Sequence, residues 1–276
     1  MPAYARPTRI EDALKLLARG GRTVLAGGTD FYPARVGKPL TEDVLDLTAL
    51  AELRGIDERT DHWRIGAGAT WSEVIAAQLP PLFDGLKLAA REVGGCQIQN
   101  AGTVAGNLCN ASPAADGVPP LLALDASVEI ASLGGARVLP LAKFIRGPRK
   151  TALAPDEIVT AIRVPKAVHD AQGGFLKLGA RSYLVISIAM AAAVIEHRAG
   201  VVRTARVAVG ACSPVAKRLP ELERALAGKP LDARLADCVA AAHLAPLSPL
   251  DDLRGSAAYR SEAVHVLLRR LIAQMT

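Results

Sequence analysis

The first half of the chain alternates short apolar runs with clusters of turn-forming residues, a pattern typical of alternating helices and strands. Apolar residues at helical spacing predict a helix over residues 9–18, begun by a capping box of Thr8 and Glu11. A second capping box, Thr70 with Glu73, predicts a helix through about residue 78. Apolar runs bounded by turns predict strands at 23–26, 44–47, 64–69 and 158–164, and a hairpin at 128–131 and 137–140.

One long stretch breaks this pattern. A helix is expected over residues 86–93, and the segment from Gly94 to Pro120 that follows is rich in Gly, Asn, Ala and Pro and has little periodicity. An irregular segment of that length inside a compact protein is usually functional. We therefore expect a binding loop here.

The second half begins after a polar, turn-forming stretch at 165–174, where we predict a domain boundary, with the second unit starting near Phe175. Residues 186–196 are small and apolar, and residues 201–211 are rich in β-forming residues. Helices are predicted at 215–227 and 231–243, and a last helix carries an apolar face made of Val264, Leu267, Leu268 and Leu271.

Composition narrows the class of protein. Half of the 276 residues are apolar, and the length suggests two domains on the usual scale of roughly 100 to 200 residues each. The apolar stretch 184–195 is interrupted by Ser187 and is shorter than the roughly 20 residues that cross a bilayer, so we expect no membrane span. The N-terminus lacks an apolar signal core, which predicts a cytoplasmic protein.

The net charge of +6 does not by itself indicate nucleic acid binding, because the basic residues are spread along the chain and aromatic residues for stacking are few. A basic surface fits anionic cofactors or partner subunits equally well. We expect no nucleic acid partner.

Neither the four cysteines nor the five histidines form a metal-binding pattern. Cys96, Cys109, Cys212 and Cys238 are far apart without a CxxC pair, and we expect four buried thiols. The histidines have no carboxylate or cysteine at ligand spacing, so they are expected to be structural or solvated. No nucleophile elbow or paired carboxylate stands out. We therefore assign no metal site and no catalytic residue to this chain.

Two glycine-containing loops are the candidates for ligand binding. Ala26-Gly27-Gly28-Thr29-Asp30 follows a predicted strand, and its glycines would let main-chain amides approach a pyrophosphate. Two glycines after a strand more often form an ordinary tight turn, and this loop is not a GxGxxG fingerprint.

The second loop runs from Asn100 to Asn107 and continues to Asp116. Its small residues would let a flat cofactor come close, Thr103, Asn107 and Ser112 could supply neutral hydrogen bonds, and Asp116 could accept from ribose or ribityl hydroxyls. A purely structural loop is an equally good interpretation of this composition.

Together the loops, AGGTDF and NAGTVAGNLCNASPAAD, resemble the two FAD-binding segments in the flavoprotein subunits of molybdenum hydroxylases. That family includes the flavin domain of xanthine dehydrogenase and the medium subunit of carbon monoxide dehydrogenase. A third segment, DDLRGSAAYR at 251–260, resembles the C-terminal signature of the same family. The matches occur in family order, so the resemblance covers essentially the whole chain.

The resemblance implies an α+β fold. Residues 1–168 would form an FAD-binding domain of the vanillyl-alcohol oxidase-like (PCMH) type, with α/β subdomains of about 1–57 and 58–168. Residues 172–276 would form a small α+β C-terminal domain with an antiparallel sheet.

The resemblance also implies the residues that contact FAD. One loop would hold the pyrophosphate and the other would form the opposite wall, and three further positions would complete the site. Lys177 would place a cation near the isoalloxazine, where it would stabilise the anionic reduced flavin. Without the resemblance, a solvated surface lysine would be the more common interpretation of this residue. The expected contacts are Ala26, Gly27, Gly28, Thr29, Asp30, Phe31, Thr103, Val104, Ala105, Gly106, Asn107, Asp116, Val159 and Lys177.

Three positions depart from the family pattern. Gln99 stands where the family often has Arg, and Val185 or Ile186 stands where it has Asp. Val93 replaces the aromatic residue that stacks on the flavin in xanthine dehydrogenase. Xanthine is therefore not assigned as the substrate.

In the function that the resemblance implies, this chain accepts electrons from [2Fe-2S] clusters of a small subunit and passes them from FAD to NAD, a quinone or another acceptor. A large molybdopterin-binding subunit would oxidise the substrate, and the complex would be a dimer of heterotrimers. The alternatives are a stand-alone flavin oxidoreductase and a flavin-free scaffold subunit.

Overall fold

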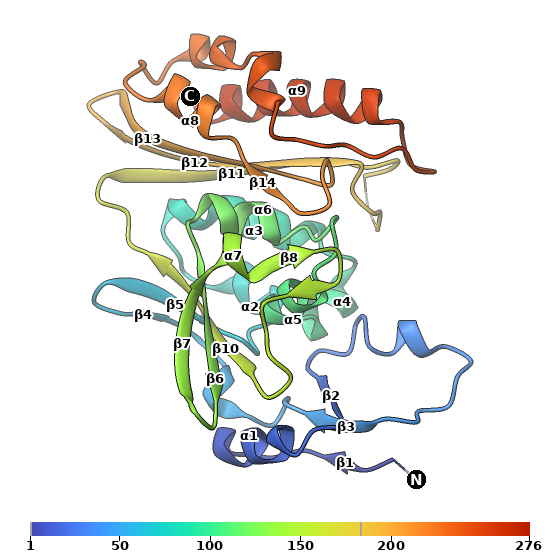
Figure 1. The fold of residues 1–276 in the computed structure, drawn as a ribbon. Helices are drawn as coiled ribbons and strands as arrows, with labels where there is room; N and C mark the ends of the chain where they lie inside the picture. Colours follow the sequence, from blue (N-terminus) through green and yellow to red (C-terminus); the bar gives the residue numbers. More distant parts are fainter. Residues whose placement is uncertain (1, 183) are drawn as a thin grey trace.

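The protein is built in three layers, stacked from bottom to top in Figure 1. The computed structural model describes residues 2–182 and 184–276. A small N-terminal sheet lies at one end, a five-stranded sheet with several helices lies in the middle, and a four-stranded sheet covered by the last helix lies at the other end. This mixture of helices and sheets, with an antiparallel sheet in the second half, confirms the predicted α+β class.

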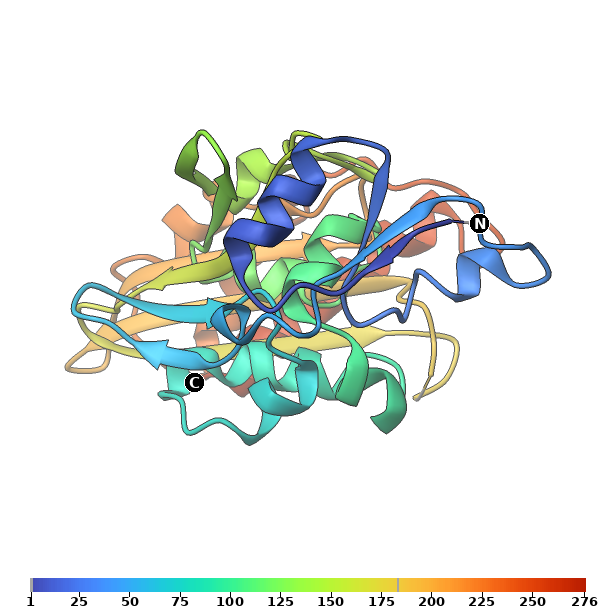
Figure 2. The ribbon, with the colours of Figure 1, turned by 90° about the horizontal axis from the view of Figure 1, so that it is seen from below.

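The N-terminal layer is a three-stranded parallel sheet with one helix. The long connection between its last two strands in the chain holds a 3-10 helix, and Figure 2 shows this connection extending beside the N-terminus, away from α1. The elements are β1 (Tyr4–Ala5), α1 (Ile10–Ala18), β2 (Arg22–Leu25), η1 (Pro33–Arg35) and β3 (Asp43–Asp46), with strand order β1-β3-β2.

The Thr8–Glu11 capping box predicted for α1 is wrong. The helix begins after Arg9, whose side chain makes no capping hydrogen bond. The amide of Ile10 instead donates to the Glu52 carboxylate at 3.0 Å. A carboxylate distant in the sequence thus satisfies a donor that a local cap was expected to satisfy.

The middle layer is an antiparallel sheet with helices packed beside it, and it confirms the predicted hairpin and the strand at 158–164. The capping box of Thr70 and Glu73 at the start of α2 is also confirmed, with both of its hydrogen bonds present. The strands, in sheet order, are β4 (Ile56–Glu58), β5 (His62–Gly66), β10 (Ile158–Pro165), β6 (Ser127–Ser132) and β7 (Gly135–Pro140). The other elements are η2 (Ala51–Leu53), α2 (Trp71–Ala76), η3 (Pro81–Phe83), α3 (Asp84–Glu92), α7 (Leu141–Phe144), β8 (Ile145–Gly147) and β9 (Lys150–Thr151).

The stretch from residue 94 to 120 is largely helical, so the predicted irregular segment was wrong for most of its length, and only residues 111–117 form a longer stretch outside helices. Its helices are six or seven residues long, fewer than two turns, so an apolar period could not repeat within them. Gly102 and Thr103 separate the first two of these helices. They are α4 (Cys96–Ala101), α5 (Val104–Asn110) and α6 (Val118–Ala123).

The second half forms an antiparallel sheet with helices on its outer face (Figure 1). The predicted apolar face of the last helix is confirmed, since all four of its residues are buried. No helix within the described ranges is both long and apolar enough to cross a bilayer. The elements are β11 (Asp170–Leu178), β12 (Ala189–Arg198), β13 (Val201–Gly210), β14 (Lys217–Arg218), α8 (Pro220–Leu226), η4 (Ala233–Cys238), η5 (Ala241–Leu244) and α9 (Ala257–Gln274).

The turn expected at 165–174 is shorter than predicted, because β11 already begins at Asp170. The glycines that suggested a turn serve close packing instead. A Cβ on Gly173 would lie 2.5 Å from the carbonyl oxygen of Leu82, so only glycine lets the strand approach this neighbour.

The two helices predicted between 215 and 243 are also corrected. The first begins only at Pro220, because the preceding residues pair with β13 as β14. Proline is favoured in a first helical turn, where its missing amide costs nothing. The second, expected at 231–243, is replaced by the two 3-10 helices η4 and η5.

Strand β12 is buried on both faces and joins two hydrophobic cores. Met190, Ala192 and Val194 belong to the core shared with the middle layer, and the alternate residues Ala191 and Ala193 belong to the core under α9. Successive strand residues point to opposite faces, so such a strand requires a continuous apolar run. This explains the small apolar stretch seen in the sequence.

The expectation of four buried thiols was wrong. Cys212 is buried and Cys238 is partly buried, whereas Cys96 and Cys109 are exposed. Both exposed cysteines lie on the short helices α4 and α5, which the sequence analysis did not predict.

Candidate functional site

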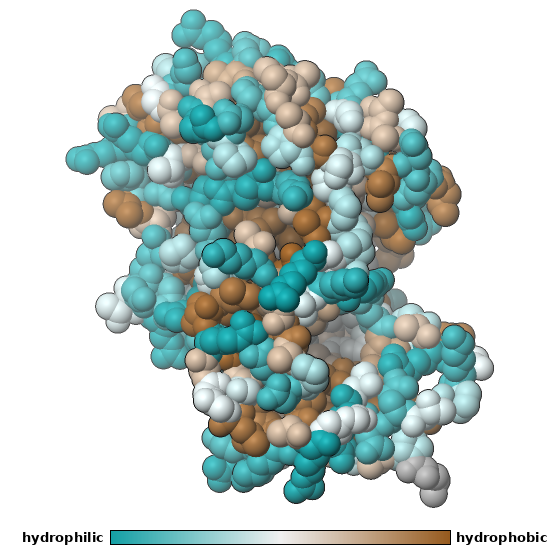
Figure 3. Space-filling model, in the orientation of Figure 1, coloured by the Kyte–Doolittle hydropathy of each residue, from teal (hydrophilic) through white to brown (hydrophobic). Residues whose placement is uncertain are grey.

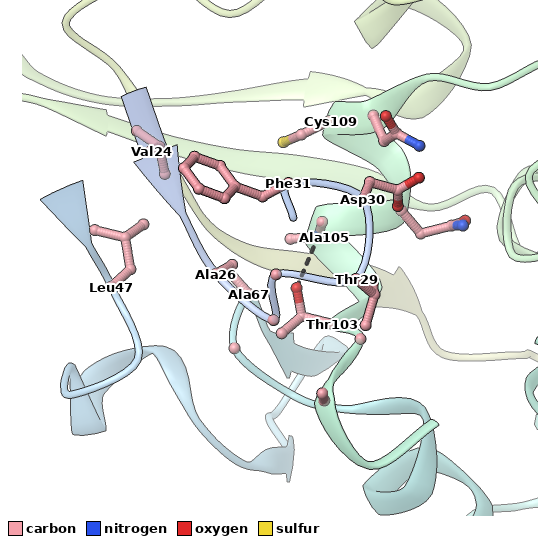
Figure 4. A pocket seen from close by; sticks show the side chains of 18 of the residues that line it. Val24, Ala26, Thr29, Asp30, Phe31, Leu47, Ala67, Thr103, Ala105 and Cys109 are labelled. Carbon is pink, nitrogen blue, oxygen red and sulfur yellow. Dashed lines mark hydrogen bonds between the residues drawn. The ribbon is translucent and has the colours of Figure 1, made fainter. Parts of the chain in front are cut away.

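A cavity of about 720 Å³ lies between the N-terminal layer and the short helices of the middle layer. The surface in Figure 3 is hollowed between these two parts of the molecule. Both glycine-containing loops line the cavity, and the close-up in Figure 4 shows Ala26 and Thr29 of the first loop beside Thr103 and Ala105 of the second. A volume in the range of roughly 300 to 1,000 Å³ is usual for small-molecule and cofactor sites.

The first loop follows directly from the end of β2 and is held by glycine conformations. Gly28 has φ +74°, a left-handed conformation that side chains disfavour, and a Cβ on it would lie 2.6 Å from the Tyr32 ring. The amide of Tyr32 donates to the Gly28 carbonyl at 3.1 Å, which folds the chain back on itself. Gly27 packs against the end of α4.

The second loop contains the start of helix α5. The Thr103 hydroxyl accepts from the Gly106 amide at 3.0 Å and caps α5. The side chain of Val104 is fully buried in the core, and its amide donates to the Ala69 carbonyl at 2.9 Å. Thr103 and Gly106 therefore meet the cavity, while Val104 supports this wall from behind.

Asn107 carries a buried oxygen that has no hydrogen-bond partner among the described residues. Its side chain lies on α5 and lines the cavity. Buried polar atoms are nearly always paired, so this unpaired Oδ1 atom is unusual, and it lies beneath the cavity surface rather than on it. A Cβ on Gly117 would lie 2.9 Å from it, which shows how closely the backbone encloses this oxygen.

Most of the residues predicted from the sequence are brought together around the cavity. Those that line it are Ala26, Gly27, Gly28, Thr29, Asp30, Phe31, Thr103, Ala105, Gly106, Asn107 and Val159. Among the described residues, Val104, Asp116 and Lys177 stand outside this lining.

Asp116 and Lys177 form a buried ion pair. The Lys177 Nζ atom lies 2.9 Å from Asp116 Oδ2, and the side chains are 5% and 12% exposed. Ser187 donates to the other carboxylate oxygen at 2.6 Å. Burial raises the pKa of Asp116 above its ordinary value, and the Lys177 charge and the Ser187 hydroxyl oppose this rise.

The ion pair is close to the cavity wall although it does not line it. Lys177 Nζ also donates to the carbonyl of Glu92 at 3.3 Å, and the next residue, Val93, lines the cavity. Lys177 belongs to β11 and Asp116 to the segment between α5 and α6. The pair therefore joins the second-half sheet to the layer that contains the cavity.

The other family departures have ordinary surroundings. Gln99 is partly buried on α4, and its side-chain amide donates to the Arg91 carbonyl at 3.0 Å. Val185 is partly buried and Ile186 is exposed, and both precede β12.

Sequence reasoning missed a third wall of the cavity. It comes from the end of β3, from η2 and from the start of β10 with the segment before it, and it contributes apolar side chains, the cation of Arg54 and the carboxylate of Glu157. The only available signal was the adjacency of Ile158 to the predicted contact Val159. The residues missed there are Leu47, Thr48, Leu53, Arg54, Leu153, Glu157 and Ile158. Trp71 and Arg35, from α2 and η1, were missed as well.

Known proteins match this chain over nearly its whole length. Residues 1–167 match the FAD binding domain in molybdopterin dehydrogenase, and residues 175–275 match the CO dehydrogenase flavoprotein C-terminal domain. These two domains, with a cofactor-sized cavity in the first, define a flavoprotein of the molybdopterin-dependent dehydrogenases.

Curated relatives narrow the class further. The xanthine dehydrogenase FAD-binding subunit of Escherichia coli O157:H7 is 30% identical, with 99% of this chain and 95% of that protein covered. The carbon monoxide dehydrogenase medium chain of Afipia carboxidovorans is 32% identical, with 98% and 94% covered. The chain belongs to the family of FAD-binding medium subunits of molybdenum hydroxylases, which are oxidoreductase complexes.

Solved structures agree with this assignment. A carbon monoxide dehydrogenase from Hydrogenophaga pseudoflava, which lacks the Mo-pyranopterin moiety of the molybdenum cofactor, contains a chain that superimposes with a TM-score of 0.88. The two chains are 27% identical, and the match covers 99% of this chain and 96% of the other.

Proposed function

We propose that the cavity holds FAD with its pyrophosphate between the two loops. Residues 26–31 would form one side and residues 103–107 the other, with Val159 on the third wall. The observation that carries the proposal is the cavity of about 720 Å³ that both glycine-containing loops line, with their backbones in direct contact at Gly27 and Ala101.

The two loops fit a dinucleotide because both walls consist of small residues. A Cβ on Gly27 or Gly28 would collide with neighbouring atoms, so the first loop presents main chain to the cavity. Arg54 and the Thr103 hydroxyl add polar groups at the same surface. Such a cradle suits the phosphates and sugars of the cofactor, and the apolar third wall suits an aromatic base.

We place the flavin ring at the Val93 side of the cavity. Lys177 reaches the carbonyl before Val93 and would put a cation next to the ring, where it favours the reduced, anionic form. Asp116 would stay close to the ribityl chain while holding Lys177 in place. Residues 1–168 and 172–276 would be the FAD-binding and C-terminal domains.

When bound, FAD would supply redox chemistry to this chain, which would relay electrons from [2Fe-2S] clusters of a small subunit to NAD, a quinone or another acceptor. A large molybdopterin subunit would hold the substrate, and the assembly would be a dimer of heterotrimers. Relatives named for xanthine and for carbon monoxide both have this type of subunit, so this type of subunit does not set the substrate that the complex oxidises. A cytoplasmic location is part of the proposal.

Purification tests the proposal directly. The chain made alone is expected to carry about one FAD per chain, seen as the visible flavin absorbance, and no stoichiometric iron or molybdenum. Purification from the native source should bring molybdenum and iron–sulfur chains with it. A folded chain that neither carries nor takes up FAD would make it a scaffold subunit, and substrate oxidation by the chain alone would make it a self-sufficient flavoenzyme.

A further inference from the structure

The segment between β2 and β3 begins with the glycine loop, and its two ends contact each other at the edge of the cavity. Phe31 and Arg35 both line the cavity, and Glu42 lies at the end of the segment, just before β3. Among the described residues, Glu42 is not part of the cavity lining. A change at Glu42 can therefore reach a bound ligand only through its neighbours or by its charge.

Arg35 joins the two ends of this segment. Its guanidinium stacks on the Phe31 ring, with the Cζ atom 3.8 Å from the ring centroid. Nη1 donates to the Phe31 carbonyl at 2.8 Å. Nε donates to Glu42 Oε1 at 2.7 Å, and Nη2 contacts the same carboxylate. All three nitrogens of one side chain are thus used within the segment.

We propose that Phe31, Arg35 and Glu42 form a clasp that holds the glycine loop in the conformation that receives FAD. Arg35 is then a positioning residue. The inference rests on the proposed function and extends it to the residues that shape the loop. The planar guanidinium suits the task because it can stack, donate to a carbonyl and pair with a carboxylate at once.

A positioning role is favoured because the charge of Arg35 is already matched. The two side chains are 28% and 32% exposed, so Glu42 offsets the cation at the cavity edge. Were Arg35 only an electrostatic ligand for the diphosphate, Glu42 would compete with the cofactor, and its neutralisation would strengthen binding. A clasp predicts the opposite, because an unordered loop must be ordered when the cofactor binds.

The deciding experiment compares Glu42→Gln with the parent full-length chain, both prepared without flavin. FAD is titrated while the fluorescence of the chain is followed, since Trp71 lies in the cavity wall and reports occupancy. The clasp predicts that Kd rises about ten-fold in Glu42→Gln, the cost of ordering a few residues on binding. Glu221→Gln, which breaks an exposed ion pair with Arg224, is the matched control and should bind as the parent does.

Conservative variants separate positioning from general stability. Glu42→Asp keeps the charge and should recover most of the affinity, whereas Arg35→Lys keeps a cation but cannot stack and donate in a plane and should not. Unchanged or tighter binding by Glu42→Gln overturns the clasp while the proposed function stands. A parent chain that binds no FAD overturns both.

Discussion

Gly27 and Ala101 bring the two walls of the cavity into direct backbone contact. A Cβ placed on Gly27 would lie 1.9 Å from the carbonyl oxygen of Ala101 and 3.0 Å from the Cα atom of Gly102. No side chain fits there without moving one wall away from the other. The width of the cavity at this point is therefore set by main chain.

Gly28→Val is expected to lose FAD. The left-handed backbone at Gly28, φ +74°, is strained for a branched residue, and its Cβ would enter the Tyr32 ring. The measurement is the FAD-to-protein ratio of protein shown by circular dichroism to be folded. Gly228→Val is the matched control, because its φ is +76° and the space around it is open. An equal loss of FAD in both variants would attribute the effect to stability alone.

Gly106→Val is expected to lose FAD for a different reason. A Cβ here would lie 2.8 Å from the Thr103 hydroxyl, so valine disturbs the cap of α5 and narrows the cavity. Loss of the cap should cost about 1 kcal/mol of unfolding free energy. Gly106→Ala should retain more FAD than Gly106→Val, because the added volume is smaller. A folded valine variant with full FAD occupancy would refute the two-loop site.

Asn107→Leu is expected to separate binding from stability. The substitution removes a buried oxygen that has no partner. The free energy of unfolding of the flavin-free protein, measured in urea, should therefore be unchanged or higher by up to about 1 kcal/mol. FAD affinity should fall by about two-fold to ten-fold, the worth of one net hydrogen bond. A less stable variant with unchanged affinity would place this oxygen in a structural role.

Lys177→Met is expected to destabilise the fold by about 3–5 kcal/mol, because it leaves the Asp116 carboxylate buried without its partner. The pKa of Asp116 is already raised by burial, and it should rise further in the variant. A raised folded-state pKa contributes stability that is present at low pH and lost as pH rises through it. Urea midpoints of the variant should therefore be higher at pH 5.5 than at pH 7.5.

A second substitution serves as the control for this prediction. Lys177→Met with Asp116→Asn should recover much of the stability and lose the pH dependence, because no carboxylate is left to titrate. With FAD bound, Lys177→Met at pH 7.5 should also have a lower flavin reduction potential than the parent, since the cation near the ring is gone and the Asp116 carboxylate remains. An unchanged potential would show that Lys177 does not face the flavin.

Sequence patterns predicted those helices and strands that are long enough for the spacing of their apolar residues to repeat. The apolar face of α9 spans several turns, and the runs that became β6 and β7 flank a glycine turn, so both were predictable. The capping box at α2 formed as its local spacing predicted, whereas the same spacing of Thr8 and Glu11 formed none at α1, where the distant Glu52 accepts from the first amide. The helices α4 and α5 were not, since each is too short to show a period.

The sequence by itself determined which two loops carry the small residues, and with them two of the walls of the cavity. Tertiary structure alone decided the third wall, because Leu53 and Leu153 line the same cavity only once η2 and the segment before β10 have folded around it. It also decided that Lys177 pairs with Asp116, since the two are 61 residues apart. Local patterns reach only a few residues along the chain, whereas packing joins elements without regard to their separation, so contacts of this kind follow from the fold.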